Sequence, residues 1–456
     1  MRARAGSVLL TVVCAVVALL LAGCAASVDG QAFASSAVTA GIDPNFVQGN
    51  DGGDDDRLAA AVLRDLETWW GGQFPALAGG ARFTPLKGYF SVDSSRDGPG
   101  PPCTQSASEV EGNAFYCPRA DIIAYDRASL LPVLRQKFGD SAVAVVLAHE
   151  FGHSVQQRLE ESSRSAPGLG SGAPTILSEG QADCYAGTFL RAVHDGQTPD
   201  LRTGEKGIDA AMSALITFRD PVGTDAADDR AHGNAFDRVS SFQDGFDGGP
   251  SACAGMTLQN RSFTQQSFAT LSDAQSGGNL PLPDLVRAMG SDLDRYFGGL
   301  VRQRGGTWTA PAIREGGAGC GRDAVDLCTG SGPPTLAVDD RGLARIHDGI
   351  GDYASGTVIA SRYALAAMAA LGRPTTGPKA GTTALCLAGA YTGDVGGAGS
   401  DFSLSPGDLD EAVGLLESDD SAARGTDGAT AAGGAYARIE DFRGGVTGSA
   451  QRCLGS

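Results

Sequence analysis

The sequence has little positive charge. Its 456 residues include 35 lysines and arginines against 53 aspartates and glutamates, which gives a net charge of -18 and a pI near 4.6. A protein that binds nucleic acid needs clustered positive charge to meet the phosphates. The composition therefore excludes a nucleic-acid partner, while the length allows two or three domains.

Long hydrophobic runs are also missing. The apolar run at residues 8–22 follows Arg2 and Arg4 and is shorter than the roughly 20 residues that span a bilayer. It is typical of a signal peptide. The run ends in Leu21-Ala22-Gly23-Cys24, which resembles the lipobox of bacterial lipoproteins. This resemblance implies a signal peptide over 1–23 and a lipid on Cys24 that anchors the exported chain to the outer side of the cell membrane. An ordinary cleavage site is the alternative.

Residues 24–56 are rich in Ala, Ser, Gly and Asp. This composition predicts a flexible tether between the expected anchor and the first domain.

Histidine is scarce, with five in the chain, yet two of them form His149-Glu150-Phe151-Gly152-His153. Residues four apart share one face of a helix, so His149 and His153 can bind one metal ion. Glu150 flanks that face and can act as general base toward a water on zinc. Asp140 can cap the helix, and an apolar stripe follows it. The sequence predicts zinc-assisted hydrolysis here.

A catalytic zinc site needs a third protein ligand. Glu179 is the best candidate, and Asp183, one helical turn later, can accept the free N–H of a zinc-bound histidine. The pattern looks like that of the thermolysin-like zincins. The metzincin pattern fails because Gln156 and Leu159 stand where it requires Gly and His. The alternative is an accidental match on an amphipathic helix, which the second carboxylate pair disfavours.

Eight cysteines remain after Cys14 and Cys24 are set aside. An even number in an exported chain predicts disulfides. The eight are Cys103, Cys117, Cys184, Cys253, Cys320, Cys328, Cys386 and Cys453.

An internal repeat suggests how they pair. Three segments of the first half have similar segments in the second. Residues 233–242 are similar to 433–442, residues 182–187 to 384–389, and Gly139-Asp140 to Gly351-Asp352. We therefore expect two related halves, 57–253 and 284–456, joined by a linker at 254–283. Equivalent order in the halves predicts the pairs Cys103–Cys117, Cys184–Cys253, Cys320–Cys328 and Cys386–Cys453.

The second half lacks the zinc residues. The counterparts of His149, Glu150, His153, Glu179 and Asp183 are Ser361, Arg362, Leu365, Gly381 and Leu385. Features kept in both halves, such as Arg238 with Arg438 and Phe242 with Phe442, are interpreted as packing.

His232 is among the residues found only in the first half, because its counterpart in the second half is Ala432. A donor present only in the first half is a candidate for stabilising a developing oxyanion. The alternative is a histidine that only hydrogen-bonds within its loop.

Several motifs of the first half together resemble the predicted neutral zinc metallopeptidases of bacteria. They are residues 114–118, the helix at 148–153 with Gln156-Gln157, residues 181–187, and His232-Gly233. The resemblance implies a zincin-like fold, with His149, His153 and Glu179 as zinc ligands and Glu150 as base. We expect a helix-rich α+β protein whose zincin-like domain is followed by a degenerate second copy.

The expected function is hydrolysis of peptide or protein substrates at the bacterial cell envelope. One alternative is a non-catalytic envelope-binding lipoprotein with a vestigial zinc site. Another is a zinc hydrolase that acts on a non-peptide amide, because the ligands define the nucleophile and not the substrate.

Overall fold

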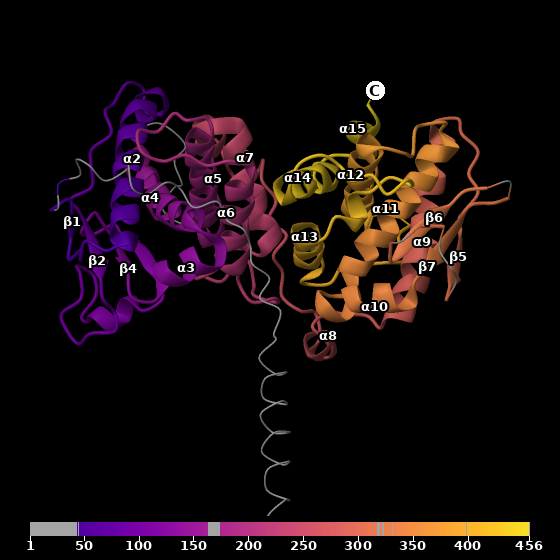
Figure 1. Cartoon of the computed structure of the whole chain (residues 1–456), viewed down its shortest axis with the longest axis horizontal. Coiled ribbons are helices and arrows are strands. Elements are labelled where there is room, and N and C mark those ends of the chain that lie inside the picture. Colours follow the sequence, from indigo (N-terminus) through magenta and orange to yellow (C-terminus); the bar gives the residue numbers. More distant parts are fainter. Residues whose placement is uncertain are drawn as a thin grey trace, which may run out of the picture.

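The computed structural model describes residues 43, 45–162, 174–316, 320–321, 323–330, 332–397 and 399–455. It is a helix-rich α+β protein whose two halves lie side by side (Figure 1). The first half contains β1 (Val47–Gln48), α2 (Asp54–Leu77), β2 (Gly88–Val92), η1 (Ala107–Val110), β3 (Ala114–Cys117), β4 (Ile122–Asp126), α3 (Leu130–Phe138), α4 (Asp140–Ser162), α5 (Thr175–His194), α6 (Glu205–Thr217) and α7 (Ala235–Ala254).

The second half follows the short helix α8. It contains α9, three strands and then helices α10 to α15. The elements are α8 (Leu271–Ser276), α9 (Leu282–Gln303), β5 (Ala312–Glu315), β6 (Val325–Cys328), β7 (Thr335–Val338), α10 (Asp340–Gly349), α11 (Asp352–Ala370), α12 (Pro378–Asp394), α13 (Asp408–Ser418), η2 (Ser421–Ala423), α14 (Ala435–Val446) and α15 (Ala450–Leu454).

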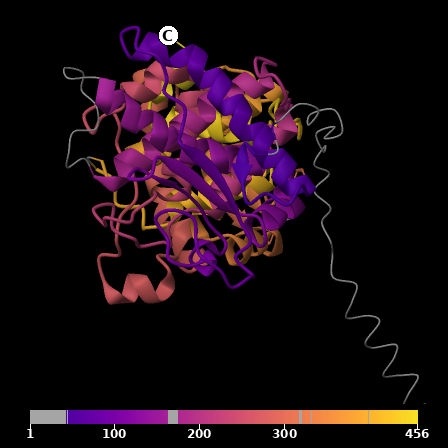
Figure 2. The same ribbon diagram turned by 90° about the vertical axis from the view of Figure 1, so that its left-hand side faces the viewer.

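The sheets of the two halves share one pairing scheme. In the first, β2 pairs parallel with β4 and β3 pairs antiparallel with β4. In the second, β5 pairs parallel with β7 and β6 pairs antiparallel with β7. The first sheet has the additional short strand β1 beside β2, so β3 forms its other edge. Figure 2 looks onto the side of the molecule where this sheet lies.

Glycines bring equivalent helices unusually close in both halves. A Cβ atom on Gly187 of α5 would lie 2.0 Å from the Phe242 carbonyl oxygen of α7. A Cβ atom on Gly389 of α12 would lie 2.0 Å from the Phe442 carbonyl oxygen of α14. Real side chains do not fit at such distances, so the α5–α7 and α12–α14 contacts both require glycine.

A disulfide lies next to each of these close contacts, from α5 to the end of α7 in the first half and from α12 to α15 in the second. The bonds Cys184–Cys253 and Cys386–Cys453 join equivalent places in the two halves. The other two bonds are Cys103–Cys117 and Cys320–Cys328. All four predicted pairs are confirmed.

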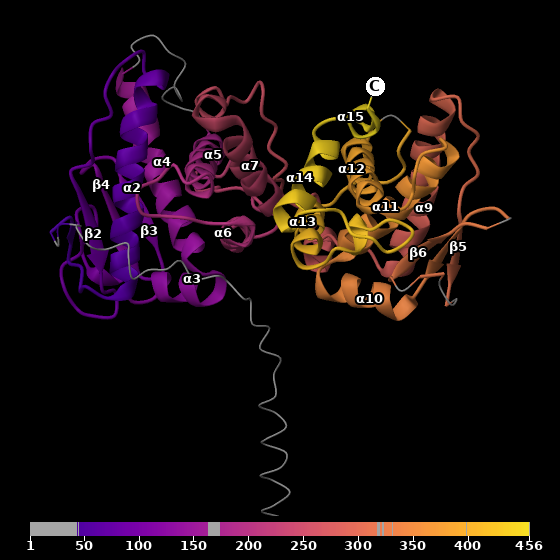
Figure 3. The same cartoon turned by 45° about the horizontal axis from the view of Figure 1, so that its top comes forward.

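The halves meet through α6 and α7 on one side and α13 and α14 on the other (Figure 3). The Tyr436 N–H at the start of α14 donates to Asp209 Oδ1 of α6 at 2.7 Å. Reciprocally, the Phe236 N–H at the start of α7 donates to Asp410 Oδ1 of α13 at 3.2 Å. Each half thus caps a helix of the other, as in an interface with two-fold symmetry.

One expected boundary needs correction. Residues 47–48 pair with β2, and the Asp51 N–H donates to Asp56 of α2, so the expected tether extends too far toward residue 56. The expected linker at 254–283 packs on the first half. The backbone N–H groups of Thr264 and Gln265 donate to the Asp237 carboxylate, which fixes this segment on α7.

The expected signal peptide and Cys24 lie outside the described residues. In the part of the chain that is described, no helix has the length and apolar character needed to cross a membrane.

Candidate metal centre

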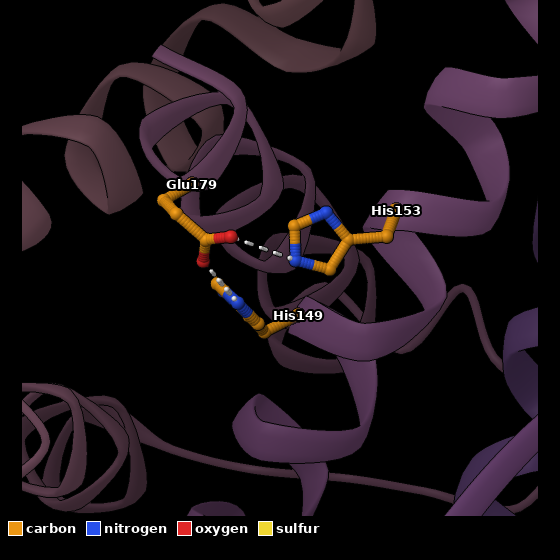
Figure 4. Close-up of side chains that lie close together, drawn as sticks. All are labelled: His149, His153 and Glu179. Atoms are coloured by element: carbon orange, nitrogen blue, oxygen red, sulfur yellow. Dashed lines mark hydrogen bonds and ion pairs between the residues drawn. The ribbon is translucent and has the colours of Figure 1, made fainter. Parts of the chain in front are cut away.

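Two packed helices bring together three side chains that can bind a metal ion. His149 and His153 lie on α4, and Glu179 lies on α5 (Figure 4). His149 Nε2 is 3.1 Å from Glu179 Oε2, and His153 Nε2 is 3.5 Å from Glu179 Oε1. One ligand atom from each residue lies within 4.8 Å of the others. The predicted ligand set therefore converges on one point.

These separations fit a zinc ion. Zinc binds nitrogen and oxygen at about 2.0–2.2 Å in a tetrahedron, which places neighbouring ligand atoms roughly 3.4 Å apart. The observed Nε2-to-oxygen distances of 3.1 and 3.5 Å lie on either side of that value. Two imidazoles and one carboxylate also form a ligand set of the catalytic type, which leaves a position for water.

The far side of each imidazole has its own partner. His149 Nδ1 lies 2.7 Å from Asp183 Oδ1, and His153 Nδ1 lies 2.9 Å from Gln156 Oε1. Both partners accept a hydrogen bond from Nδ1–H, which leaves each Nε2 free to bind a metal. Arg238 donates from Nε and Nη2 to Asp183 at 2.9 and 2.8 Å. Asp183 is fully buried, so this ion pair compensates its charge.

The carboxylates stabilise positive charge at the imidazoles. Burial opposes a charge on His149, but Asp183 and Glu179 outweigh it and raise the pKa of His149 to about 10. Burial likewise opposes the charge on Glu179, but the two histidines hold the pKa of this carboxyl well below its usual value. The arrangement therefore favours a cation between the three side chains.

Glu150 is held beside the ligands by the sheet. Its Oε2 accepts the backbone N–H of Tyr116 in β3 at 2.8 Å. Burial raises the pKa of Glu150, with the two histidines acting in the opposite direction. A carboxylate with a raised pKa is a better proton acceptor at neutral pH.

A cavity of about 400 Å³ opens in front of these groups. Residues 112–116 form one wall, and Leu215 and Phe218, at the end of α6, form part of another. His232 also lines the cavity. Its backbone N–H donates to Asp220 Oδ2 at 2.8 Å, its Nδ1 lies 3.5 Å from Asp220 Oδ1, and 52% of its side chain is exposed.

The sequence missed some of the residues that support the site. Arg238 was interpreted as packing, but it pairs with the carboxylate that holds His149. Gln156 was used to exclude the metzincin pattern and in the family resemblance, but not as a partner of His153, although its place three residues after His153 puts both on one helix face. The Tyr116 N–H contact with Glu150 crosses from strand to helix, and no sequence spacing indicates it.

The counterparts in the second half form no such centre. Arg362 is buried and donates to the carbonyl oxygens of Ser421 and Arg424. A Cβ atom on Gly381 would lie 2.0 Å from the Ala423 carbonyl oxygen, so a side chain has no room there. The equivalent space is filled by an arginine and a loop.

Comparison with known proteins relates the first half to other bacterial chains. Over 240 residues the chain is 28% identical to Uncharacterized protein YpfJ of Escherichia coli K12, covering 49% of this chain and 77% of that protein. Over 171 residues it is 32% identical to Uncharacterized protein Rv2575 of Mycobacterium tuberculosis H37Rv, covering 33% of this chain and 57% of that protein. No solved structure matches.

The family model that matches residues 2–256 is described as "Putative neutral zinc metallopeptidase". The match covers more than half of the chain and includes the whole metal centre, from His149 to Arg238. The chain therefore belongs to this family of neutral zinc metallopeptidases.

Proposed function

We propose that the protein is a zinc-dependent metallopeptidase, with His149, His153 and Glu179 as ligands. The convergence of these three side chains carries the proposal. A zinc ion bound there would supply a Lewis acid for a carbonyl oxygen and lower the pKa of a bound water. Asp183 and Gln156 hold the imidazoles in the tautomer that this site needs.

Glu150 is the proposed general base. It flanks the ligands without being one, and it lines the same cavity. Its carboxylate would take a proton from the attacking water and pass it to the leaving amine. The bond from the Tyr116 N–H fixes one of its oxygens and leaves the other for this transfer.

Strand β3 offers a place for an extended peptide. It is an edge strand and it lines the cavity. The Asn113 and Cys117 carbonyl oxygens accept hydrogen bonds from the β4 side, so Ala114 and Tyr116 direct their backbone groups the other way, toward α4. The Tyr116 N–H is already donated to Glu150, so a peptide would pair with the Ala114 backbone groups and the Tyr116 carbonyl oxygen. This pairing would place a scissile bond beside the proposed ligands, which favours a peptide over a compact amide substrate.

His232 is the proposed oxyanion donor. It lines the cavity and is fixed through Asp220. An exposed imidazole at the cavity wall can donate to an oxygen that gains charge during the reaction.

The second half is proposed to be a degenerate copy of the first. The shared strand pairing, the close helix pairs, the equivalent disulfides and the reciprocal caps support a duplication. It would keep the scaffold and carry no catalysis.

We further propose that the chain is exported and anchored by a lipid on Cys24, with its substrate at the outer side of the cell membrane. The signal-like N-terminus and the four disulfides, which persist in oxidising compartments, support this location.

The test is Glu150→Gln in the full chain, assayed against an unbiased peptide mixture by mass spectrometry. Removal of the base should lower cleavage at least about 100-fold, while the zinc content stays that of the parent. Ser361→Ala, at the counterpart of His149, serves as the control and should cleave normally. Parental activity in Glu150→Gln would contradict the mechanism, and a zinc-loaded parent without cleavage would favour the binding lipoprotein.

A further inference from the structure

A second group of metal-binding side chains lies in the second half, apart from the metal centre. Asp352 begins α11, and Asp408 and Glu411 lie in the first turn of α13. One carboxylate oxygen from each lies within 4.8 Å of the others. Asp352 and Asp408 are buried, and Glu411 is partly buried.

No described arginine or lysine compensates these three acids, and His347 lowers the pKa of Asp352 by less than burial raises it. Among the described residues, no ion pair joins an arginine or lysine to any of them. Burial and mutual repulsion raise the pKa of Asp408 to about 8 and that of Glu411 to about 9. Three neighbouring carboxylates in this setting need protons or a cation.

One oxygen in the group meets no N–H or hydroxyl donor. Asp352 is only 3% exposed. Its Oδ2 accepts the Leu280 N–H at 2.7 Å, whereas its Oδ1 is buried and has no such donor among the described residues. The side-chain hydrogen bond between Asp352 and Glu411 requires a proton on one of the two carboxyl groups. Without that proton, a cation is needed to satisfy the buried oxygen.

The matching place in the first half has an arginine, although Asp140 Oδ2 there is likewise buried without a hydrogen bond among the described residues. Asp140, the counterpart of Asp352, is 2.9 Å from Arg135 Nε. Counting from the shared Gly-Asp pair, the counterpart of Arg135 is His347, which contacts the Leu280 carbonyl and Asp348 instead.

The other two carboxylates are also particular to the second half. Aligning the reciprocal caps Asp209 and Asp410 places Gly207 and Ala210 at the positions of Asp408 and Glu411. Around Asp352 the second half therefore lacks the arginine of the first half and has two additional carboxylates, Asp408 and Glu411.

We propose that Asp352, Asp408 and Glu411 bind a calcium ion. An all-carboxylate set is a hard oxygen site, which suits calcium or magnesium and not zinc. Magnesium usually keeps several waters and uses one or two carboxylates, so three converging protein carboxylates favour calcium.

The ion would join three segments of the second half. Asp352 is also linked to residues 279 and 280 before α9, because its N–H donates to Asn279 Oδ1 and its Oδ2 accepts the Leu280 N–H. Asp408 and Glu411 lie on α13, which also carries Asp410, the cap of α7. Calcium would therefore stabilise α13 and, through it, the contact between the halves.

The experiment uses the full chain with zinc kept saturating, after removal of calcium with a calcium-selective chelator. Thermal unfolding is followed as CaCl2 or MgCl2 is added up to millimolar concentration, and bound calcium is counted by equilibrium dialysis. We expect one calcium per chain and a saturable rise in Tm, with a weaker response to magnesium.

The double variant Asp408→Asn, Glu411→Gln should lose the calcium response. Its calcium-free Tm should equal or exceed that of the calcium-free parent, because the repulsion is gone. Asp348→Asn, which removes a nearby exposed carboxylate, should respond like the parent. A parent that binds no calcium, or a response to magnesium equal to that for calcium, would overturn the proposal. Because zinc and peptidase activity are not the readouts, this test is independent of the proposed function.

Discussion

Position 179 of the first half carries a glutamate, and its counterpart in the second half, position 381, carries a glycine. Glu179 lies between two imidazoles, whereas the space beside Gly381 is occupied by the Ala423 backbone. The sheet pairing and the close helix contacts are nevertheless the same in both halves. This scaffold therefore does not depend on the three converging side chains, and in the second half the equivalent space is filled.

Arg362 shows how the filling works. It stands where the first half has Glu150, is buried, and donates to two backbone carbonyls of the loop after α13. Burial lowers the pKa of Arg362 to about 10. The second half thus has an arginine that supports a loop where the first half has a carboxylate that faces a cavity.

The largest expected effect is the difference between substituting Arg238 and substituting its counterpart Arg438. Arg238→Gln leaves Asp183 buried without its ion pair, which should cost about 3–5 kcal/mol of unfolding free energy. It should also weaken zinc binding about 10–100-fold, because Asp183 orients His149.

Arg438→Gln is the matched control, since Arg438 donates to the Leu416 and Glu417 carbonyl oxygens and forms no ion pair within the described part of the chain. It should cost about 0.5–1.5 kcal/mol and leave zinc affinity unchanged. Urea unfolding and competition with a zinc chelator measure both quantities. Equal losses from the two substitutions would show that Arg238 has no special tie to the metal centre.

The next effect tests whether the space beside Gly381 in the second half is filled. Gly381→Ala should destabilise the protein by about 1–3 kcal/mol, because the added Cβ would meet the Ala423 carbonyl oxygen. Gly71→Ala is the control, because no atom lies within 4 Å of a Cβ built there. It should be neutral or stabilise the helix by up to about 1 kcal/mol. If both variants unfold at the same urea concentration, the space beside α12 is open after all.

The smallest effect tests the symmetry of the interface. Asp209→Ala and Asp410→Ala each remove a cap from a helix of the opposite half, so each should cost about 1 kcal/mol. Unfolding of the single and double variants would show whether the losses are similar and add. A neutral result for one of them would show that the reciprocal contacts are not equivalent.

The sequence predicted those parts of the site that follow helical spacing. His149 with His153, and Glu179 with Asp183, are each one turn apart on a helix, and the structure brings both pairs together. The disulfide pairs could be predicted because the repeat gives the order of the cysteines twice.

The rest depends on contacts between distant segments. Arg238 reaches Asp183 across 55 positions, and the Tyr116 N–H reaches Glu150 across 34. The packing of Thr264 and Gln265 on Asp237 likewise has no signal in the composition of a polar segment that resembles a linker. Such contacts become visible only when the helices and strands are placed in space.

The most direct test of the central claim is the zinc content of the purified full chain, measured by mass spectrometry beside His149→Ala, His153→Ala. The double variant keeps Glu179 and the second half, so it asks whether the three converging side chains form the site. We expect one zinc per parent chain and none in the variant. A parent without zinc after purification free of chelators, or a variant that retains it, would contradict the account.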